Sequence, residues 1–531
     1  MTDPVPARPA PAQPSAPAPA ADQGARLADG DWHRVHPLTP AIRSWQLVVF
    51  VLLVAVQNVG GDVAQGDLPD FGRPHPGGRL LAGGGAILLL AVLLVLGVAA
   101  LSWRMTRFRV TPDALELHSG VLYRQQRRAR LDRLQAVDIV QPLLARVTGL
   151  ARLTLEVAGG SGSAVTLSYL TEAQAASLRN HLLARAAGLH YDSDEAPEAP
   201  EHGVVEVPAP RLIASLVFSG ATLTLALALL ALAAAALGFG QLGVVIGAFP
   251  FLIGVVSVQW ARFSGGFGFR VATSPDGLRL RHGLLEQRAQ TVPPGRVQAV
   301  RVRQPLLWRG FDWWSVEVNV AGYGSGGGTD SRSPESVLLP VGTRQEAIAV
   351  LSLVLPQLTV EPGESPAEVV VSGLAGAGEA HGYLVAPDRA KWVDPLAYRR
   401  TGARVTREAL LIRRGLLVRQ LDVVPHARSQ SWGLTQGPVQ RRLGLASFQL
   451  HSTPGPVTPQ VPHLDARTAA ALLADQTERA RHARASAGPE RWMEGVNGTG
   501  TAPSSPDGST PAPTSGPPSA PAPGTEGSSP A

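Results

Sequence analysis

Residues 133–143 read Arg-Leu-Gln-Ala-Val-Asp-Ile-Val-Gln-Pro-Leu, and altered copies of this stretch recur at residues 296–306 and 428–439. In each copy a glycine precedes two glutamines, which follow it by fifteen and by twenty-one residues. The nine residues of this signature are Gly120, Gln135, Gln141, Gly283, Gln298, Gln304, Gly415, Gln430 and Gln436. Because all three copies keep these spacings without insertions, the chain contains three copies of one structural unit.

Each unit has the pattern of a small β-rich domain. Apolar and polar residues alternate at residues 115–118, 153–157 and 316–320, which is typical of strands that bury one face. The signature glycine predicts a tight turn between two strands. A second glycine follows the last glutamine of each unit, and these are Gly149, Gly310 and Gly444.

A helix is expected at the end of each unit, over residues 172–185, 344–355 and 466–474. Thr171 and Gln174 have the spacing of a capping box at the start of the first of these helices. Several strands followed by one helix predict a small β-barrel closed by a C-terminal helix, three times over.

Two uncharged apolar stretches, residues 80–101 and 212–261, are long enough to cross a membrane. A crossing helix needs about 20 apolar residues, so the second stretch must fold back, with its turn at residues 238–241. Residues 44–61 are a weaker crossing that pairs with residues 80–101. The alternative, buried helices of a soluble core, is less consistent with segments that are apolar on every face. We therefore expect two transmembrane hairpins, four helices in all.

Arginines flank the outer ends of both hairpins, at Arg43, Arg104, Arg211 and Arg262. Positive residues favour the cytoplasmic side, so the expected location is a multi-pass protein of the bacterial cell membrane, with both termini and all three β-rich domains in the cytoplasm. The expected boundaries are a Pro/Ala-rich tail 1–40, hairpin 41–103, domain 104–188, linker 189–210, hairpin 211–262, domain 263–358, linker 359–394, domain 395–478 and a Pro/Ser/Gly-rich tail 479–531.

The composition points away from catalysis. The 531-residue chain has no cysteine, so a disulfide framework, a thiolate metal site and a thiol nucleophile are excluded. Its histidines have no metal-ligand spacing, and residues 322–328 are glycine-rich but lack the lysine of a phosphate-binding loop. We predict no catalytic residue, no metal site and no cofactor.

The most basic stretch lies in the first unit and contains Arg124, Arg127, Arg128, Arg130 and Arg133. Anionic lipid near the inner leaflet attracts such arginines by about 1 kcal/mol each, so a lipid or partner contact is a candidate role. The alternative is a solvated strand face. Nucleic acid is not an expected partner, because exposed aromatic residues do not alternate with these arginines.

Aromatic residues gather in the second unit, at Phe311, Trp308, Trp313 and Trp314. A place in the core of the β-rich domain is favoured over a place at the membrane interface, where aromatic side chains are also common.

The signature stretches at 133–143, 296–306 and 428–439 resemble the bacterial pleckstrin-homology-like domains of the YdbS/YdbT membrane family, and the likeness extends to the hairpins. The resemblance implies three such domains, and a role in envelope stress or in resistance to membrane-active peptides. It implies no catalytic or ligand residues. The third unit departs from the family pattern because it lacks its own hairpin.

The expected function is that of a non-catalytic membrane scaffold. Its cytoplasmic domains would bind membrane lipid, another membrane protein or one another, and linked modules strengthen weak contacts. The competing hypothesis is a component of a transporter or exporter, prompted by the four helices, but charged residues that mark a transport path are missing from them. An enzyme whose site forms between repeats is the third hypothesis.

Overall fold

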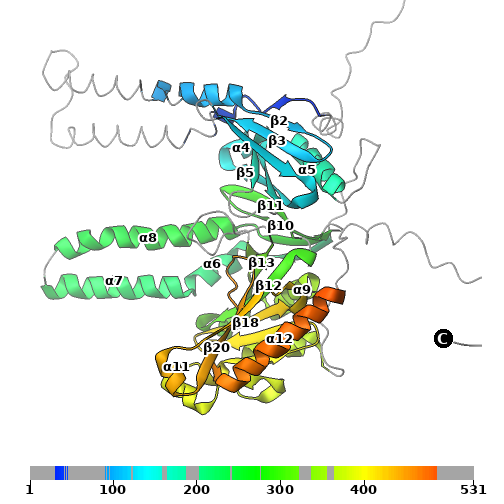
Figure 1. Cartoon of the computed structure of the whole chain (residues 1–531). Coiled ribbons are helices and arrows are strands. Elements are labelled where there is room, and N and C mark those ends of the chain that lie inside the picture. The colour runs from blue at the N-terminus through cyan, green and yellow to red at the C-terminus, as the bar shows by residue number, and fades with distance from the viewer. Residues whose placement is uncertain are drawn as a thin grey trace, which may run out of the picture.

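The computed structural model describes residues 30–40, 42, 45, 90, 92–94, 96–120, 124–157, 164–186, 202–239, 242–274, 277–292, 294–321, 336–355 and 364–486. The three β-rich units are arranged one after another along the molecule, and the hairpin of α7 and α8 projects from one side of this array (Figure 1). We call the units repeat 1, repeat 2 and repeat 3.

Each repeat has the same order of seven strands and a closing helix. Repeat 1 contains β1 (His33–Arg34), β2 (Arg107–Val110), β3 (Ala114–Ser119), β4 (Gln125–Arg130), β5 (Leu134–Pro142), β6 (Leu150–Val157), β7 (Val165–Thr171) and α5 (Glu172–Ala186). Repeat 2 contains β8 (His202–Glu206), β9 (Arg270–Ser274), β10 (Gly277–His282), β11 (Glu286–Val292), β12 (Val297–Pro305), β13 (Trp313–Val320), β14 (Val337–Thr343) and α9 (Arg344–Val354). Repeat 3 contains β15 (Leu384–Val385), β16 (Gly402–Val405), β17 (Ala409–Arg414), β18 (Val418–Pro425), β19 (Ser431–Thr435), β20 (Leu445–His451), β21 (Gln460–Asp465) and α12 (Ala466–Ser486).

The sheets cross the boundaries between repeats. The last three strands of repeat 1 and the first four of repeat 2 form one seven-stranded antiparallel sheet, in the order β7-β6-β5-β11-β10-β9-β8. Repeats 2 and 3 share a second seven-stranded sheet, in the order β14-β13-β12-β18-β17-β16-β15. The ends of the array are the sheets β1-β2-β3-β4 and β19-β20-β21. The predicted small barrels are therefore not separate bodies, because neighbouring repeats are joined by backbone hydrogen bonds.

Each repeat also has a hydrophobic core under its closing helix. In repeat 1, Leu178 and Leu182 of α5 pack with Leu153 and Leu155 of β6, and all four are fully buried. The predicted capping box at this helix is confirmed, since the Gln174 backbone N–H donates to the Thr171 hydroxyl at 3.3 Å and the Thr171 N–H donates to Gln174 Oε1 at 3.1 Å. Repeats 2 and 3 have equivalent clusters under α9 and α12.

The signature glycines lie between the third and fourth strands of each repeat. Their φ angles are 108° at Gly120, 114° at Gly283 and 82° at Gly415, values that side chains with a Cβ rarely adopt. The second glycine of the unit has positive φ in repeats 1 and 3, at Gly149 and Gly444. In repeat 2 the left-handed residue is Asp312, with φ 51°, and not Gly310.

We expect Gly415→Ala to lower the free energy of unfolding of repeat 3 by about 1–3 kcal/mol, the usual cost of a strained backbone. An alanine Cβ there would also collide with the Val418 carbonyl oxygen. Gly310→Ala is the matched control, because its Cβ would meet nothing within 4 Å and its φ is not positive. Hydrogen exchange of β17 and β18 measures the difference, and equal protection in both variants would contradict this account.

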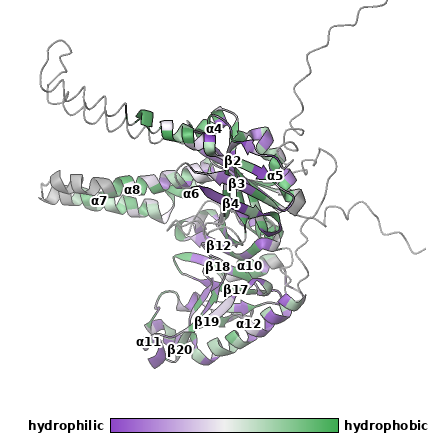
Figure 2. Cartoon of the chain, turned by 45° about the horizontal axis from the view of Figure 1, so that its top comes forward, coloured by the Kyte–Doolittle hydropathy of each residue, from purple (hydrophilic) through white to green (hydrophobic). Residues whose placement is uncertain are grey.

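The hairpin of repeat 2 consists of α6 (Ala209–Val217), α7 (Gly220–Phe239) and α8 (Leu242–Gly266), close to the predicted helices and turn. No single helix in the described part of the chain passes the length and hydropathy test for a membrane span, but Ala209–Val217 and Gly220–Ala234 pass together, bent by 48°. Hydrophobic residues predominate along the described parts of α7 and α8 (Figure 2). Of the first predicted hairpin, the helix Val92–Met105 is apolar but shorter, and residues 46–89 lie almost wholly outside the described residues.

The bend between α6 and α7 was not predicted. It is supported by Gln259 of α8, whose side-chain amide donates to the Leu216 carbonyl at 3.2 Å and to the Thr222 hydroxyl at 2.7 Å. A break in a helix exposes carbonyl groups, and here a neighbouring helix supplies their donor.

Ordered structure also extends into segments expected to be linkers or tails. β8 lies in the expected linker 189–210, and α10 (Pro366–Ala375) and β15 lie in the expected linker 359–394. β1 lies in the expected N-terminal tail, and α12 continues to Ser486, beyond the expected start of the second tail at 479. The short strands β1, β8 and β15 extend the sheets, so these residues belong to the repeats.

Candidate functional site

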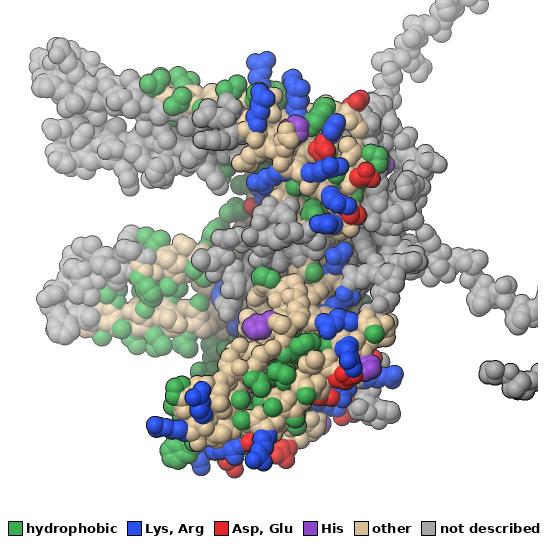
Figure 3. Space-filling view, viewed as in Figure 1, with side chains coloured by type: hydrophobic (Ala, Val, Ile, Leu, Met, Phe, Trp, Pro, Cys, Tyr) green, Lys and Arg blue, Asp and Glu red, His purple; other side chains and the backbone are tan. Residues whose placement is uncertain are grey.

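The five predicted arginines come together on one exposed ribbon of repeat 1. Arg127, Arg128 and Arg130 lie on β4, Arg124 directly precedes it, and Arg133 follows in the 3-10 turn Leu131–Arg133. All five are exposed, and basic side chains are visible over the outer end of repeat 1 (Figure 3). The sequence stretch therefore forms one surface.

Two of these arginines have acidic neighbours. The Arg128 Nε lies 3.6 Å from a carboxylate oxygen of Glu116, and the Arg130 Nη2 lies 2.7 Å from that of Asp132. The hydrogen bond from Arg130 lowers the pKa of Asp132 below its usual value. Arg127 Nη1 donates to the Ala164 carbonyl at 3.4 Å, so its charge has no acidic partner in that contact.

β4 is the end strand of its sheet within the described residues, and this sets it apart from its equivalents. The equivalents, β11 in repeat 2 and β18 in repeat 3, are each covered by a strand of the preceding repeat. We call the side of β4 that faces away from β3 the β4 edge. An edge strand presents backbone N–H and C=O groups to a further strand.

The two covered edges have the same register. At junction 1, between β5 and β11, Pro142 lies opposite Glu286 and Gln141 opposite Gln287. At junction 2, between β12 and β18, Pro305 lies opposite Val418 and Gln304 opposite Arg419. The register is therefore a property of the repeat, used twice in one chain.

The junctions explain the second signature glutamine. Gln141 and Gln304 are buried, with 8% and 4% of their surface exposed, because the next repeat covers them. The Gln304 Oε1 accepts from Arg419 Nη1 of repeat 3 at 3.5 Å. Gln436 is exposed at the far end of the array and donates to the Leu445 carbonyl at 2.8 Å within its own repeat. Of the first glutamines, Gln298 is buried and Gln430 is exposed, and the side chain of Gln135 lies outside the described residues.

Side chains of both repeats meet across junction 1. Arg152 of β6 lies 3.6 Å from the Glu286 carboxylate of β11. The guanidinium of Arg179, on α5, donates to the hydroxyl of Thr291 on β11. Helix and sheet of repeat 1 thus both contact repeat 2.

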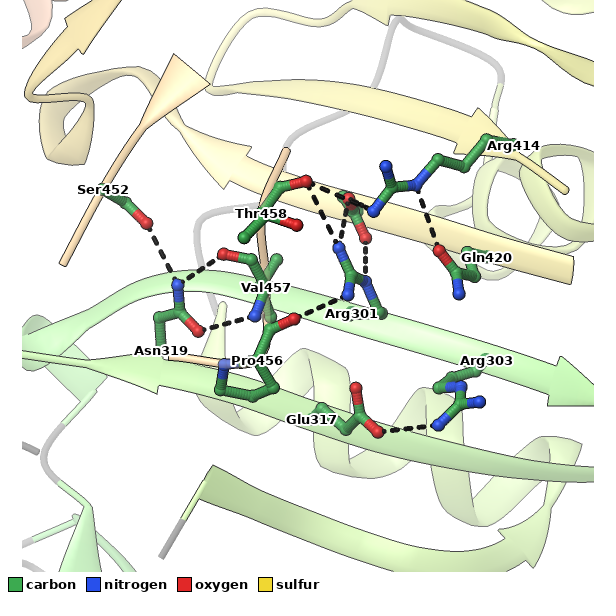
Figure 4. Close-up of polar contacts among 11 residues, drawn as sticks. Arg301, Arg303, Glu317, Asn319, Arg414, Gln420, Ser452, Pro456, Val457 and Thr458 are labelled. Atoms are coloured by element: carbon green, nitrogen blue, oxygen red, sulfur yellow. Dashed lines mark hydrogen bonds and ion pairs between the residues drawn. The ribbon is translucent and has the colours of Figure 1, made fainter. Parts of the chain in front are cut away.

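Junction 2 contains a buried ion pair between Arg301 of β12 and Asp422 of β18. Two parallel hydrogen bonds join them, at 2.6 Å from Nε and 2.9 Å from Nη2 (Figure 4). The side chains are 8% and 0% exposed. Burial alone would lower the pKa of Arg301, but the hydrogen bonds to Asp422 outweigh it and hold this pKa above its usual value. Arg301 Nη1 also donates to the Pro456 carbonyl at 2.6 Å.

A second polar contact at junction 2 is Asn319 of β13, which is 1% exposed. Its side chain brackets Val457, donating to the carbonyl at 2.7 Å and accepting from the N–H at 2.9 Å (Figure 4). Nδ2 also donates to the Ser452 hydroxyl and the Thr453 carbonyl, each at 3.1 Å. One side chain of repeat 2 therefore orders the loop between β20 and β21 of repeat 3.

Sequence reasoning missed Arg301, Asp422 and Asn319. The signal that the sequence offers is that each of them is a polar residue of a strand with an apolar residue on either side, and these apolar neighbours are buried. Such residues persist in a core when they have paired partners.

The aromatic cluster of repeat 2 lies partly in the core and partly against the hairpin. Trp314 and Trp308 are buried, as expected for the core. Trp308 Nε1 donates to the Ser215 carbonyl of α6 at 3.1 Å, and the ring of Phe311, 48% exposed, lies 5.0 Å from that of Phe218. The cluster therefore joins the core of repeat 2 to the base of its hairpin.

Acidic and histidine side chains form no group suited to a metal ion in the part of the chain that the structure describes. Arginine guanidinium groups at the β4 edge suit electrostatic contact with anionic or acidic partners. The arrangement as a whole suits binding and assembly.

Comparison with known proteins supports the architecture. The family model described as "Bacterial PH domain" matches three times, at residues 50–186, 216–358 and 350–480. A curated protein of Bacillus subtilis (strain 168), "UPF0699 transmembrane protein YdbT", is 22% identical over 304 residues, which are 52% of this chain and 61% of that protein. The matched part thus spans less than two thirds of the relative. Three repeats with this match show that the chain belongs to the bacterial PH domain family.

Proposed function

We propose that this protein is a non-catalytic scaffold of the bacterial cell membrane that offers the β4 edge to a strand of a partner protein. The observation that carries the proposal is the repeated junction: the strand equivalent to β4 is covered by another strand at junction 1 and again at junction 2. In repeat 1, among the described residues, no strand pairs with β4 on the side that faces away from β3. Strand addition at an exposed edge is a common mode of protein recognition.

The charge of the β4 edge suggests the chemistry of the partner. The residue of β4 equivalent to Asp422 is Arg127, so the charge at this place is reversed relative to junction 2. At junction 2 the opposing strand supplies a basic residue, Arg301. A strand that covers β4 would therefore supply an acidic residue opposite Arg127.

The membrane anchor is proposed from the hairpins. The bent pair of α6 and α7 passes the test for a membrane span, and α8 returns beside it. The relative carries the word transmembrane in its name. With arginines at the outer ends of both hairpins, the repeats lie in the cytoplasm. A role in envelope stress or in resistance to membrane-active peptides fits a scaffold in this place.

The test is a pull-down of the tagged full-length chain from mildly solubilised native membranes, with proteins and lipids identified by mass spectrometry. The expected result is a stoichiometric second protein that crosslinks to β4. Enriched anionic lipid without a protein would instead assign the arginines to lipid binding, and solute flux in reconstituted vesicles would favour a transporter.

We expect Arg127→Glu to reduce recovery of the partner about tenfold, because reversing one close charge pair at an interface costs at least about 1.4 kcal/mol. Arg127→Lys should keep most of the recovery. Arg481→Glu, an exposed arginine of α12, is the control. Unchanged recovery with Arg127→Glu would remove the β4 edge from the proposal.

A further inference from the structure

Repeat 3 keeps the strand framework that carries the hairpin of α6, α7 and α8 in repeat 2 and from which the first predicted hairpin leaves in repeat 1. In repeat 1 the chain leaves the paired strands β1 and β2 after Arg34 and returns at Arg107. In repeat 2 it leaves after Glu206 and returns at Arg270. In repeat 3 it leaves after Val385 and returns at Gly402. Residues 386–401 therefore stand in the topological place of a hairpin, and we call them the cap.

Hydrogen bonds at the turn after the third strand, which is β10 in repeat 2 and β17 in repeat 3, support this equivalence. In repeat 2 the turn contacts the base of the hairpin, where Gly283 N donates to the Phe267 carbonyl and Leu284 N to that of Ser264, both at 2.8 Å. In repeat 3 the equivalent turn contacts the cap, because the Gly415 carbonyl accepts from Arg400 Nε at 3.1 Å.

The cap is firmly held by repeat 3. Ala386 and Ala390 are buried against Leu445. Arg400 is buried and donates to the carbonyls of Ala375 and Leu374, at 3.1 Å and 2.5 Å. Burial, together with neighbouring arginines, lowers the pKa of Arg400 to about 10.

Large apolar side chains are nevertheless exposed on this firmly held cap. Trp392 is 75% exposed and Leu396 is 69% exposed, and Leu417 of the adjoining turn is 63% exposed. We call these three residues the cap tip. Lys391 Nζ lies 6.0 Å from the centre of the Trp392 ring, and Arg399 is exposed nearby in the chain. Tryptophan with flanking basic residues is typical of the interface between a membrane and water.

The position of the cap fits a membrane contact. The cap packs on Leu443 and Leu445, directly after α11 (Pro438–Arg442). In Figure 1, α11 lies on the side of the array toward which α7 and α8 project, and in Figure 3 hydrophobic and basic side chains occur together at this corner.

From these observations we infer that the cap tip inserts into the surface of the lipid bilayer and holds repeat 3 against it. This inference rests on the proposed membrane anchor. Repeats 1 and 2 reach the membrane through their hairpins, and repeat 3 reaches it through Trp392, Leu396 and Leu417. A segment that places an apolar face with basic neighbours in the membrane interface binds to the bilayer without crossing it.

The test uses the absence of cysteine in the chain, which allows single-cysteine labelling of the full-length protein. The variants Leu396→Cys, Leu229→Cys in α7 and Ala485→Cys at the far end of α12 are labelled with a nitrobenzoxadiazole dye. Each is reconstituted in phosphatidylcholine–phosphatidylglycerol vesicles with or without brominated acyl chains. We expect brominated lipid to reduce fluorescence at least twofold at positions 396 and 229, and to leave position 485 unchanged.

The labels separate the two proposals. Quenching at 229 without quenching at 396 would overturn the contact between the cap tip and lipid and leave the anchor intact. The same result is expected if a protein, and not lipid, covers the cap in native membranes. No quenching at 229 would overturn the anchor. As a second variant, Trp392→Ser in a Leu417→Cys background should halve the quenching at 417, because the cap tip loses one of its apolar contacts with lipid. Trp392 is exposed, so its loss leaves the core intact. Full quenching there would remove Trp392 from the contact.

Discussion

Asp422→Ala is expected to open junction 2, lowering the free energy of opening of β12 and β18 by about 3–5 kcal/mol. The reason is the state of its partner. Arg301 is 8% exposed and donates two hydrogen bonds to Asp422, so removing the carboxylate leaves a buried positive charge without its counterion. Hydrogen exchange resolved to these strands, in mild detergent, measures the change.

Two controls separate the buried charge from a general loss of stability. The double variant Arg301→Met with Asp422→Leu should recover at least half of the loss, because apolar replacements of a buried pair are often neutral. Recovery is incomplete since the Pro456 carbonyl loses its donor. Glu206→Ala removes an exposed ion pair with Arg270 and should change stability by about 1 kcal/mol or less. If Asp422→Ala lowered stability by no more than Glu206→Ala does, the buried pair would not be important for junction 2.

Asn319→Ala is expected to destabilise the loop of residues 452–458 by about 2–4 kcal/mol. One buried amide with four hydrogen-bond contacts, three of them shared by the two hydrogens of Nδ2, is lost, and each buried group left without a partner costs about 1–3 kcal/mol unless water reaches it. The effect should appear in repeat 3 although the substitution is in repeat 2. Hydrogen exchange of the Val457 N–H is the direct measurement.

Ser452→Ala is the matched control, because it removes one of the four hydrogen bonds and should cost about 1 kcal/mol or less. Gly455 provides a second check. A Cβ there would collide with the Asn319 side chain, so Gly455→Ala should weaken the same contact. If Asn319→Ala left the exchange of repeat 3 unchanged, the loop would be ordered by repeat 3 alone.

The sequence predicted much of the local structure. Alternation of apolar and polar residues places one side chain in two on each face of a strand, and this pattern marked β3, β6 and β13. The φ angles at Gly120, Gly283 and Gly415 explain why glycine recurs there. Long apolar stretches indicated α7 and α8, because composition alone makes such segments unfavourable in water.

Some local features escaped prediction because another part of the chain supplies their support. The break before α7 depends on Gln259, forty residues away from Ser219. The left-handed residue Asp312 is held by its side chain, which contacts Arg344 of α9 at 3.0 Å in addition to accepting from Trp314 Nε1 at 2.8 Å. The stretch 386–401 has no repeat signature, and its place only becomes clear from the pairing of β15 with β16.

Sequence alone therefore determined that the chain contains three similar β-rich units and long apolar stretches, because side-chain periodicity and hydropathy are carried by the residues themselves. Tertiary structure alone decided that the units form one array, that β4 is the end strand of its sheet within the described residues and that Arg127, Arg128 and Arg130 lie on that strand. The physical reason is that strand edges pair through backbone N–H and C=O groups, which nearly every residue carries. Residue types therefore do not specify which strand edges pair with each other, and only the folded chain shows which edges are covered.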